Sequence, residues 1–527
     1  MTTTRPEAAP PARILRSSAS GLALLTIASA AHAATTAAVT PAPLQPTLFV
    51  GAVATDNARL GGPGDERKDL VGETDAGLIV RSVGPRVTLT GNLGAEFIGY
   101  ARHSEPDAVL PRGHLDLSST LVDRALFFDG EAAADRTRSD PLAAQSDSFS
   151  TANTVSTTRL RASPYFAHDF SDTLSALARS DTTITRNRAV DPSAGPAPAG
   201  STYQHDTFEI VRKPAPLGVS IKGSREDTLS QDRTAPPLKS DTLQAMLTAQ
   251  VDEDVQLGVI GGREHVRHDG LVDDGNIYGG MLQWRPSRRL DLELDAQHHY
   301  FGNGFALHLK DRLPRTAVDL AMSRAVTASV AAFGSYNVDS DPTALLGAIL
   351  SSRTPDAPQN DQAAEQLAQA EGLPASFSQP TSIMSSRAQL VTRAQLNLVF
   401  DGPRDTVYAS SWYQKAVALA DAPAVPATIT NIDTRQWGGS LGFYHRLTPT
   451  LSAAAEAQWS TTDALSDRAG DHQHQASGTL SLTQRLGPHT TLSGGARHFS
   501  ARTALASTAT TTQVRENQAF VGLRMQY

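Results

Sequence analysis

The feature that most constrains the fold is the alternation of apolar and polar residues in many short runs. In residues 86–97, every second position is apolar or glycine, and most of the positions between are polar. Residues 290–297, 451–459 and 478–486 repeat the pattern. A period of two is the geometry of a β-strand with one apolar and one polar face. Each run has about 9 to 14 residues, the length with which a tilted strand crosses a bilayer core.

The connections between these runs alternate in length. Residues 82–85, 252–255 and 285–288 are tight turns, whereas residues 58–69 and 189–203 are long polar loops. Short turns at one end and long loops at the other are typical of outer-membrane barrels. The sequence therefore predicts an all-β fold, a closed antiparallel transmembrane β-barrel of about 22 strands (roughly 18 to 24), with short periplasmic turns and long extracellular loops.

The last run ends at the final residue printed, and it suggests how the sheet closes. Val521, Leu523, Met525 and Tyr527 share one face as a C-terminal assembly signal, and Arg524 lies on the other. Lipid offers no hydrogen-bond partner to an unpaired strand edge. We therefore expect the last strand to pair with the first, near residues 46–57. Tyr527 is expected at the periplasmic interface, where aromatic residues are favoured.

The first 33 residues have the pattern of a secretory signal. Three arginines precede the apolar stretch GLALLTIASAA, and Ala31-His32-Ala33 fits a cleavage site, so cleavage is expected after Ala33. Residues 34–46 are then a periplasmic segment and residues 47–527 the barrel. The chain has no cysteine, which excludes disulfides, a lipoprotein anchor and thiolate metal ligands. The predicted location is the bacterial outer membrane.

The composition limits the partners. Only 19% of the residues are charged and the formal net charge is -8, so a nucleic-acid partner has little electrostatic support. The expected partners are outer-membrane lipid and lipopolysaccharide, and the machinery that assembles barrels.

A periplasmic propeller or solenoid is the soluble alternative to the barrel fold, but the runs have no fixed repeat length.

Several stretches resemble the outer-membrane barrel family associated with PEP-CTERM and exosortase systems. The resemblance spans almost the whole mature chain and is most specific at the W-x-P-S-R turn (284–288) and in the insert from SSRTPDA to GLPASF. It implies a barrel in a bacterium that makes exopolysaccharide, encoded among polysaccharide and exosortase genes. Polysaccharide export components are the further partners that it implies. It supplies no catalytic residues.

Three motifs could carry chemistry, and each has a simpler explanation. GGSLG at 438–442 fits G-x-S-x-G, but Ser440 lies in an alternating run and not in a strand-turn-helix context. His472 and His474 share a face, and His298 and His299 lie elsewhere; neither pair has an assignable third ligand. We therefore predict no catalytic residue, no metal site, no cofactor and no enzyme.

The longest insert, residues 337–380, exceeds the length of a simple connector. QAAEQLAQAE follows Asp361 as an N-cap and precedes Gly372 and Pro374, so a short helix is expected there. The apolar segment TALLGAIL would be unfavourable in open water. It either packs against the barrel mouth as a lid or folds inward and constricts the lumen, and inward folding or capping is the favoured interpretation.

The predicted lumen is mixed in charge. This suits hydrated cargo of no strong sign, and it equally suits solvated packing. The lumen-facing candidates are Arg86, Glu96, Asp129, Glu131, Arg159, Arg161, Asp291, Glu293, Asp295, Arg485, Arg497 and Arg524.

Three functions remain open. The first is a conduit or accessory component of an exopolysaccharide or PEP-CTERM protein-sorting system. The second is a general or substrate-selective porin, and the third is a barrel enzyme. Because about 16 to 18 strands already enclose a water channel, a barrel of about 22 strands would leak without a plug or an inward loop.

Overall fold

The computed structural model describes the barrel but not the chain before it. The described residues are 44–526 except for 139, 145–152, 191–196, 198, 232–237, 269–270, 329–341, 354–362, 365–366, 369–377, 379–387, 420–432, 466–467 and 507. Pro43–Tyr527 form one compact unit. The predicted signal sequence, its cleavage after Ala33 and the interfacial placement of Tyr527 lie outside the described residues.

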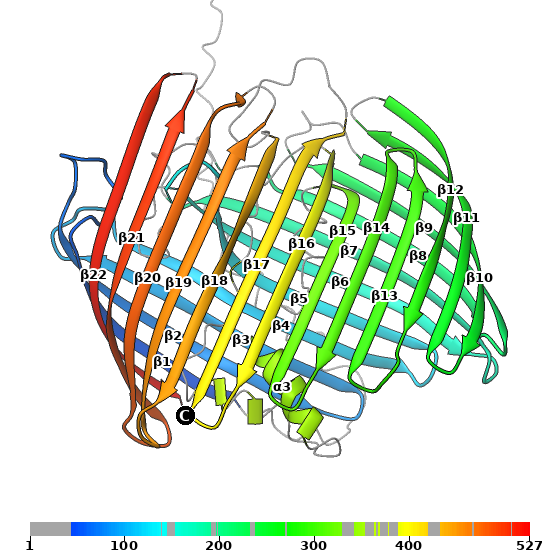
Figure 1. Ribbon diagram of the computed structural model, residues 1–527, viewed down its shortest axis with the longest axis horizontal. Helices are drawn as coiled ribbons and strands as arrows, with labels where there is room; N and C mark the ends of the chain where they lie inside the picture. Colours follow the sequence, from blue (N-terminus) through cyan, green and yellow to red (C-terminus); the bar gives the residue numbers. More distant parts are fainter. Residues whose placement is uncertain are drawn as a thin grey trace, which may run out of the picture. The chain divides into compact units, whose positions relative to one another are not determined.

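The described chain contains 22 strands (Figure 1). They are β1 (Leu44–Thr55), β2 (Asp69–Val83), β3 (Val87–Tyr100), β4 (Ala108–Val122), β5 (Leu126–Arg138), β6 (Thr154–Asp169), β7 (Leu174–Ala189), β8 (Ser201–Arg212), β9 (Leu217–Ser230), β10 (Leu238–Asp252), β11 (Val255–His268), β12 (Leu271–Trp284), β13 (Leu290–His299), β14 (Gly302–Arg312), β15 (Thr316–Ala328), β16 (Ala388–Asp401), β17 (Asp405–Ala418), β18 (Thr434–Arg446), β19 (Leu451–Ala464), β20 (His472–Arg485), β21 (Thr490–Leu505) and β22 (Thr510–Gln526).

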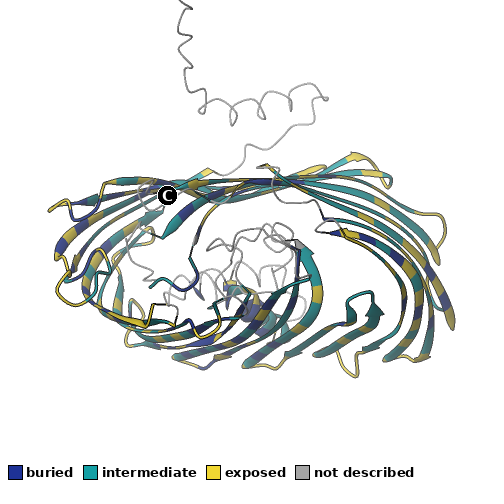
Figure 2. Ribbon diagram, turned by 90° about the horizontal axis from the view of Figure 1, so that it is seen from above, coloured by how far each residue is buried: buried dark blue, intermediate teal, exposed yellow. Residues whose placement is uncertain are grey.

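Each strand pairs antiparallel with the next, and the first pairs with the last. The β1–β22 register runs from Thr47 opposite Gln526 to Thr55 opposite Gln518, so the sheet has no free edge. Seen from above, the strands follow a ring (Figure 2). The prediction of a closed antiparallel barrel of about 22 strands is confirmed, although β1 begins at Leu44, three residues before the predicted start of the barrel.

The two ends of the barrel differ in their connections. At one end every connection is short, as between β2 and β3 (residues 84–86) and between β16 and β17 (402–404). At the other end the connections include residues 56–68 and residues 329–387, which contain the insert. The short-turn end also holds the start of β1 and the end of β22. In outer-membrane barrels this end is periplasmic.

The two faces of the strands differ as the alternation predicts. On β18, Trp437, Leu441 and Phe443 point outward and are exposed. Ser440 points inward and is buried. Because neighbouring strands are in register, directly opposed residues share a face. On β10, Leu243 is likewise exposed on the outer face.

The outer apolar surface forms a band with aromatic and polar borders. Trp437 and Trp459 lie on its long-loop side, and Trp284 lies at the short-turn end of β12; all three are exposed. Beyond Trp437, Arg435 pairs with Asp463 at 2.8 Å. An apolar band bordered by aromatic residues fits a bilayer between its two interfaces. The chain is an outer-membrane β-barrel.

Among the described residues, no helix is both long enough and apolar enough to cross a membrane.

Candidate functional site: a partly filled lumen

A helix from the long insert packs inside the barrel. Helix α3 (Pro342–Arg353) buries Leu345, Leu346 and Ile349 against inward-facing residues of four strands. These residues are Ala317 on β15, Val399 on β16, Tyr408 on β17 and Tyr444 on β18. All four lie near the short turns, and Figure 1 shows α3 at that end of β14 and β15. β15 ends and β16 begins at the opposite, long-loop end of the barrel.

One arginine joins the end of α3 to two periplasmic turns. Arg353 donates through Nε to the carbonyl of Pro314, between β14 and β15. Nη2 of the same guanidinium group donates to the carbonyl of Asp401 at 3.1 Å and pairs with the Asp401 carboxylate at 2.9 Å. The Asp401 carboxylate is almost completely buried, so it relies on this cation for compensation.

Arg353→Ala is expected to loosen α3 without unfolding the barrel. Removing the guanidinium leaves the buried Asp401 carboxylate unpaired and should weaken docking by roughly 1 to 3 kcal/mol. Hydrogen exchange at the α3 amides should accelerate accordingly, while exchange in β15 and β16 stays slow. Arg485→Ala is the matched control, because Arg485 donates to the Pro449 carbonyl at the same end of the barrel and not to α3. Unchanged exchange in α3 would exclude this tether.

Other described parts of the insert lie on the same wall. Ala364 and Ala368 are buried in the cluster that contains α3. Trp412 on β17 donates through Nε1 to the hydroxyl of Ser378 at 3.2 Å. The structure thus places the apolar segment TALLGAIL inside the barrel, as the inward-folding alternative expects. Most of the helix expected over QAAEQLAQAE lies outside the described residues.

A second loop reaches across the barrel mouth at the long-loop end. Leu142, in the connection between β5 and β6, is buried against Ala464 at the end of β19. The hydroxyl of Thr503 on β21 donates to the Leu142 carbonyl at 3.0 Å, and Gln473 on β20 donates to the Ala143 carbonyl. The β5–β6 loop therefore covers part of the opening above β19–β21.

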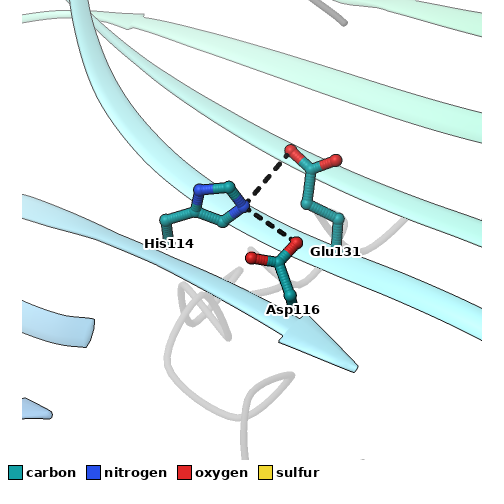
Figure 3. A group of neighbouring side chains, drawn as sticks. All are labelled: His114, Asp116 and Glu131. Carbon is teal, nitrogen blue, oxygen red and sulfur yellow. Dashed lines mark hydrogen bonds and ion pairs between the residues drawn. The ribbon is translucent and has the colours of Figure 1, made fainter. Parts of the chain in front are cut away.

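The inner wall of β4–β7 carries a network of ion pairs. Glu131 on β5 lies at its centre: Arg159 pairs with Oε1, and Arg161 Nε lies 3.5 Å from Oε2. His114 on β4 points at the same carboxylate and at Asp116, with Nε2 3.8 Å from Glu131 Oε1 and 3.1 Å from Asp116 Oδ1 (Figure 3). Asp116 and Glu131 are directly opposed across the two strands.

His114, Asp116 and Glu131 form the one group of three potential metal ligands in the described part of the chain. One imidazole and two carboxylates would suit a divalent transition metal in chemical type. However, Glu131 already faces the guanidinium groups of Arg159 and Arg161. A metal ion would have to displace them and then sit beside two fixed positive charges. We therefore interpret the group as part of the ion-pair network.

The network extends to both sides with partners that the sequence did not identify. Arg179 on β7 pairs with Asp129 at 3.1 Å and with Asp181 at 3.0 Å. Toward β2, Arg136 pairs with Glu96 and Arg112 with Asp75. Arg179 and Asp181 are two residues apart on one face of a strand, a spacing that alternation alone could have revealed. The other pairs link different strands and depend on the register.

The remaining predicted lumen residues lie apart from this network. Arg285, in the β12–β13 turn, binds Asp291 at 3.0 Å and Glu293 at 2.9 Å. Asp295 accepts from Gln297 at 2.8 Å.

The other arginines predicted to face the lumen lie at the short turns or near the closure between β1 and β22. Arg86 pairs with Asp123 at 3.1 Å beside the short turns. Arg497 lies opposite Gln518 on β22. The Arg524 guanidinium lies 5.6 Å from the ring centre of Phe49 on β1. The structure thus unites Glu96, Asp129, Glu131, Arg159 and Arg161 on one wall but does not gather the rest.

The two halves of the inner wall differ in how far they are covered. On the wall that receives the insert, Asn397 is fully buried and Ser440 is 1% exposed. On the wall of β4–β7, the side chains of His114, Asp116 and Arg161 are 41%, 57% and 34% exposed. Glu131 and Arg159 on the charged wall are only 8% and 11% exposed. Accessible space is therefore met at His114, Asp116 and Arg161, whereas the wall of β16–β18 is occupied.

The charged wall carries more acid than base. Away from the strand ends, the alternation and the ion pairs assign ten carboxylates and seven cations to the inner face of β2–β9. They are Glu73, Asp75, Glu96, Asp116, Asp129, Glu131, Asp135, Asp181, Glu209 and Glu226, and Arg81, Arg112, Arg136, Arg159, Arg161, Arg179 and Lys222.

The motifs considered for chemistry occupy structural positions. Ser440 lies inside β18, and its hydroxyl is 2.8 Å from that of Ser410 on β17, so the turn that a nucleophile elbow requires does not occur there. His472 and His474 lie on the outer face at the start of β20, with ring centres 5.3 Å apart.

His298 and His299 point to opposite faces of β13. His298 stacks on Tyr278 outside, and Nδ1 of His299 lies 2.9 Å from a carboxylate oxygen of Glu264 inside.

Comparison with known proteins finds no family model that matches the chain and no match among curated proteins. Similar solved structures include the Ferric-Catecholate import receptor Fiu from E. coli K12, with 9% identity and a TM-score of 0.46 over 91% of this chain and 81% of that one. The ferric enterobactin receptor of Pseudomonas aeruginosa has 10% identity and a TM-score of 0.44 over 92% and 80%. OccK1 of Pseudomonas aeruginosa has 8% identity and a TM-score of 0.36 over 92% and 99%.

Proposed function

We propose that this chain is a selective outer-membrane porin whose own insert narrows the lumen. The observation that carries the proposal is the packing of α3 on the inner faces of β15–β18, opposite an accessible charged wall. A barrel of this strand number would otherwise enclose a wide aqueous channel. A partly filled lumen with a polar accessible side suits the passage of small hydrated solutes.

Single-channel recording in a planar lipid bilayer tests this function. The purified, heat-modifiable barrel should give discrete conductance steps, and these should be smaller than an unobstructed barrel of 22 strands would give. Liposome swelling with neutral sugars of graded size should then show a size limit. A correctly folded barrel that gives neither current steps nor swelling would contradict a conducting function.

A role in an exopolysaccharide or PEP-CTERM system is a second, finer proposal. It rests on the resemblance of residues 284–288 and of the insert to the barrels of such systems. In that role the chain would be a conduit or an accessory component, and oligosaccharides of the secreted polymer should block the single-channel current. Deletion of the gene should also reduce the polysaccharide at the cell surface. Normal surface polysaccharide in the deletion strain would leave the general porin function as the better proposal.

A further inference from the structure

We propose that the passage left open by the insert runs along the inner face of β2–β9 and prefers cations to anions. This inference rests on the porin function and adds the class of solute that the same lumen selects. It depends on two independent observations: which side of the lumen is accessible, and which sign of charge predominates there.

The position of the insert determines which side of the lumen remains open. α3 contacts β14, β15 and β16, and the cluster that it joins also contains residues of β17, β18 and β19. The inward polar groups of β16–β18 are covered, as for Asn397 and Ser440. Across the ring, Asp116 and Arg161 keep 57% and 34% of their side-chain surface exposed. A solute that enters the lumen therefore meets the charged wall first.

The charge on the wall of β2–β9 determines whether the passage prefers cations or anions. Its carboxylates outnumber its cations by ten to seven. In addition, the guanidinium groups are largely committed to carboxylates, as Arg159 is to Glu131 and Arg179 is to Asp129 and Asp181. Asp116 is the most exposed carboxylate of the ion-pair network, and its partner is the imidazole of His114 at 3.1 Å. A passage with net negative fixed charge and low-dielectric walls concentrates mobile cations.

The reversal potential across a planar bilayer with a KCl gradient measures this preference. We expect the wild-type barrel to have a potassium-to-chloride permeability ratio of about 2 or more at low salt. The ratio should approach 1 in molar salt, where the Debye length is only about 3 Å. A ratio of 1 or below at low salt, in a barrel that conducts, would overturn the cation preference while leaving the porin function intact. Absence of any current would instead contradict the porin function.

Single substitutions locate the passage. Asp116→Asn should lower the permeability ratio, and Arg161→Gln should raise it, because each removes one exposed charge from the proposed path. Asp274→Asn is the matched control: its side chain is 78% exposed but points outward from β12, so the ratio should stay at the wild-type value. Heat-modifiability checks that each variant is folded. A wild-type ratio in both Asp116→Asn and Arg161→Gln would exclude a path along β4–β6.

Discussion

Deleting residues 341–379 should increase single-channel conductance by a factor of about 2 or more, because a barrel of this size is wide once its lumen is empty. The deletion removes α3, whose Leu346 and Ile349 are fully buried against the inner wall. It keeps the pairing of β15 with β16, which extends from Thr316 opposite Phe400 to Ala328 opposite Ala388. Shortening a loop changes stability little, so the barrel should remain folded and heat-modifiable. Larger sugars should enter in liposome swelling.

A point variant separates loss of the plug from loss of the loop. Leu346→Asp places a carboxylate in the apolar contact of α3 with the wall and should undock the helix while the insert keeps its full length. Its conductance should move toward that of the deletion. Removing residues 421–431 between β17 and β18 is a control for loop shortening. If the assembled deletion variant conducts like the wild type, the insert does not obstruct the path, and a role in binding a partner would become the better explanation.

The fold follows from the sequence because two local rules determine it. On β18 the alternation places Trp437, Leu441 and Phe443 on one face, and all three are exposed. The alternation of turn and loop lengths then gave antiparallel neighbours and their number. Closure required one further physical premise, the cost of an unpaired edge in lipid, and the β1–β22 register satisfies it.

The contents of the lumen were harder to predict because they depend on contacts between distant parts of the chain. TALLGAIL was identified as an apolar segment that needs a covering, but its partners Tyr408 and Tyr444 lie well over 50 residues away in the sequence. Nothing local to Arg353 indicates that it binds Asp401. The sequence also predicted Glu131 as a lumen residue but not its neighbour His114. The two residues come together only through the β4–β5 register, which the sequence alone does not give.

Leu523→Arg should hinder assembly strongly, whereas Arg524→Ala should have little effect. Leu523 lies on the outer face of β22, opposite Val50 on β1 and Leu492 on β21. An arginine facing lipid costs about 2 to 4 kcal/mol at the bilayer midplane and less toward the interface. The wild-type Arg524 lies on the inner face beside the Phe49 ring, where water is available. Urea unfolding of the lipid-reconstituted barrel and the yield of heat-modifiable protein measure both effects.

The contrast between these two adjacent residues tests the register and not merely the presence of a strand. Because side chains alternate between faces, a shift of one residue would exchange the positions of Leu523 and Arg524. Val521→Arg should behave like Leu523→Arg, since Val521 is 52% exposed on the same outer face. Equal losses from Leu523→Arg and Arg524→Ala would mean that the closing strand is paired differently from the register seen here. A larger loss from Arg524→Ala would reverse the assignment of the two faces and, with it, the identity of every lumen-facing residue on β22.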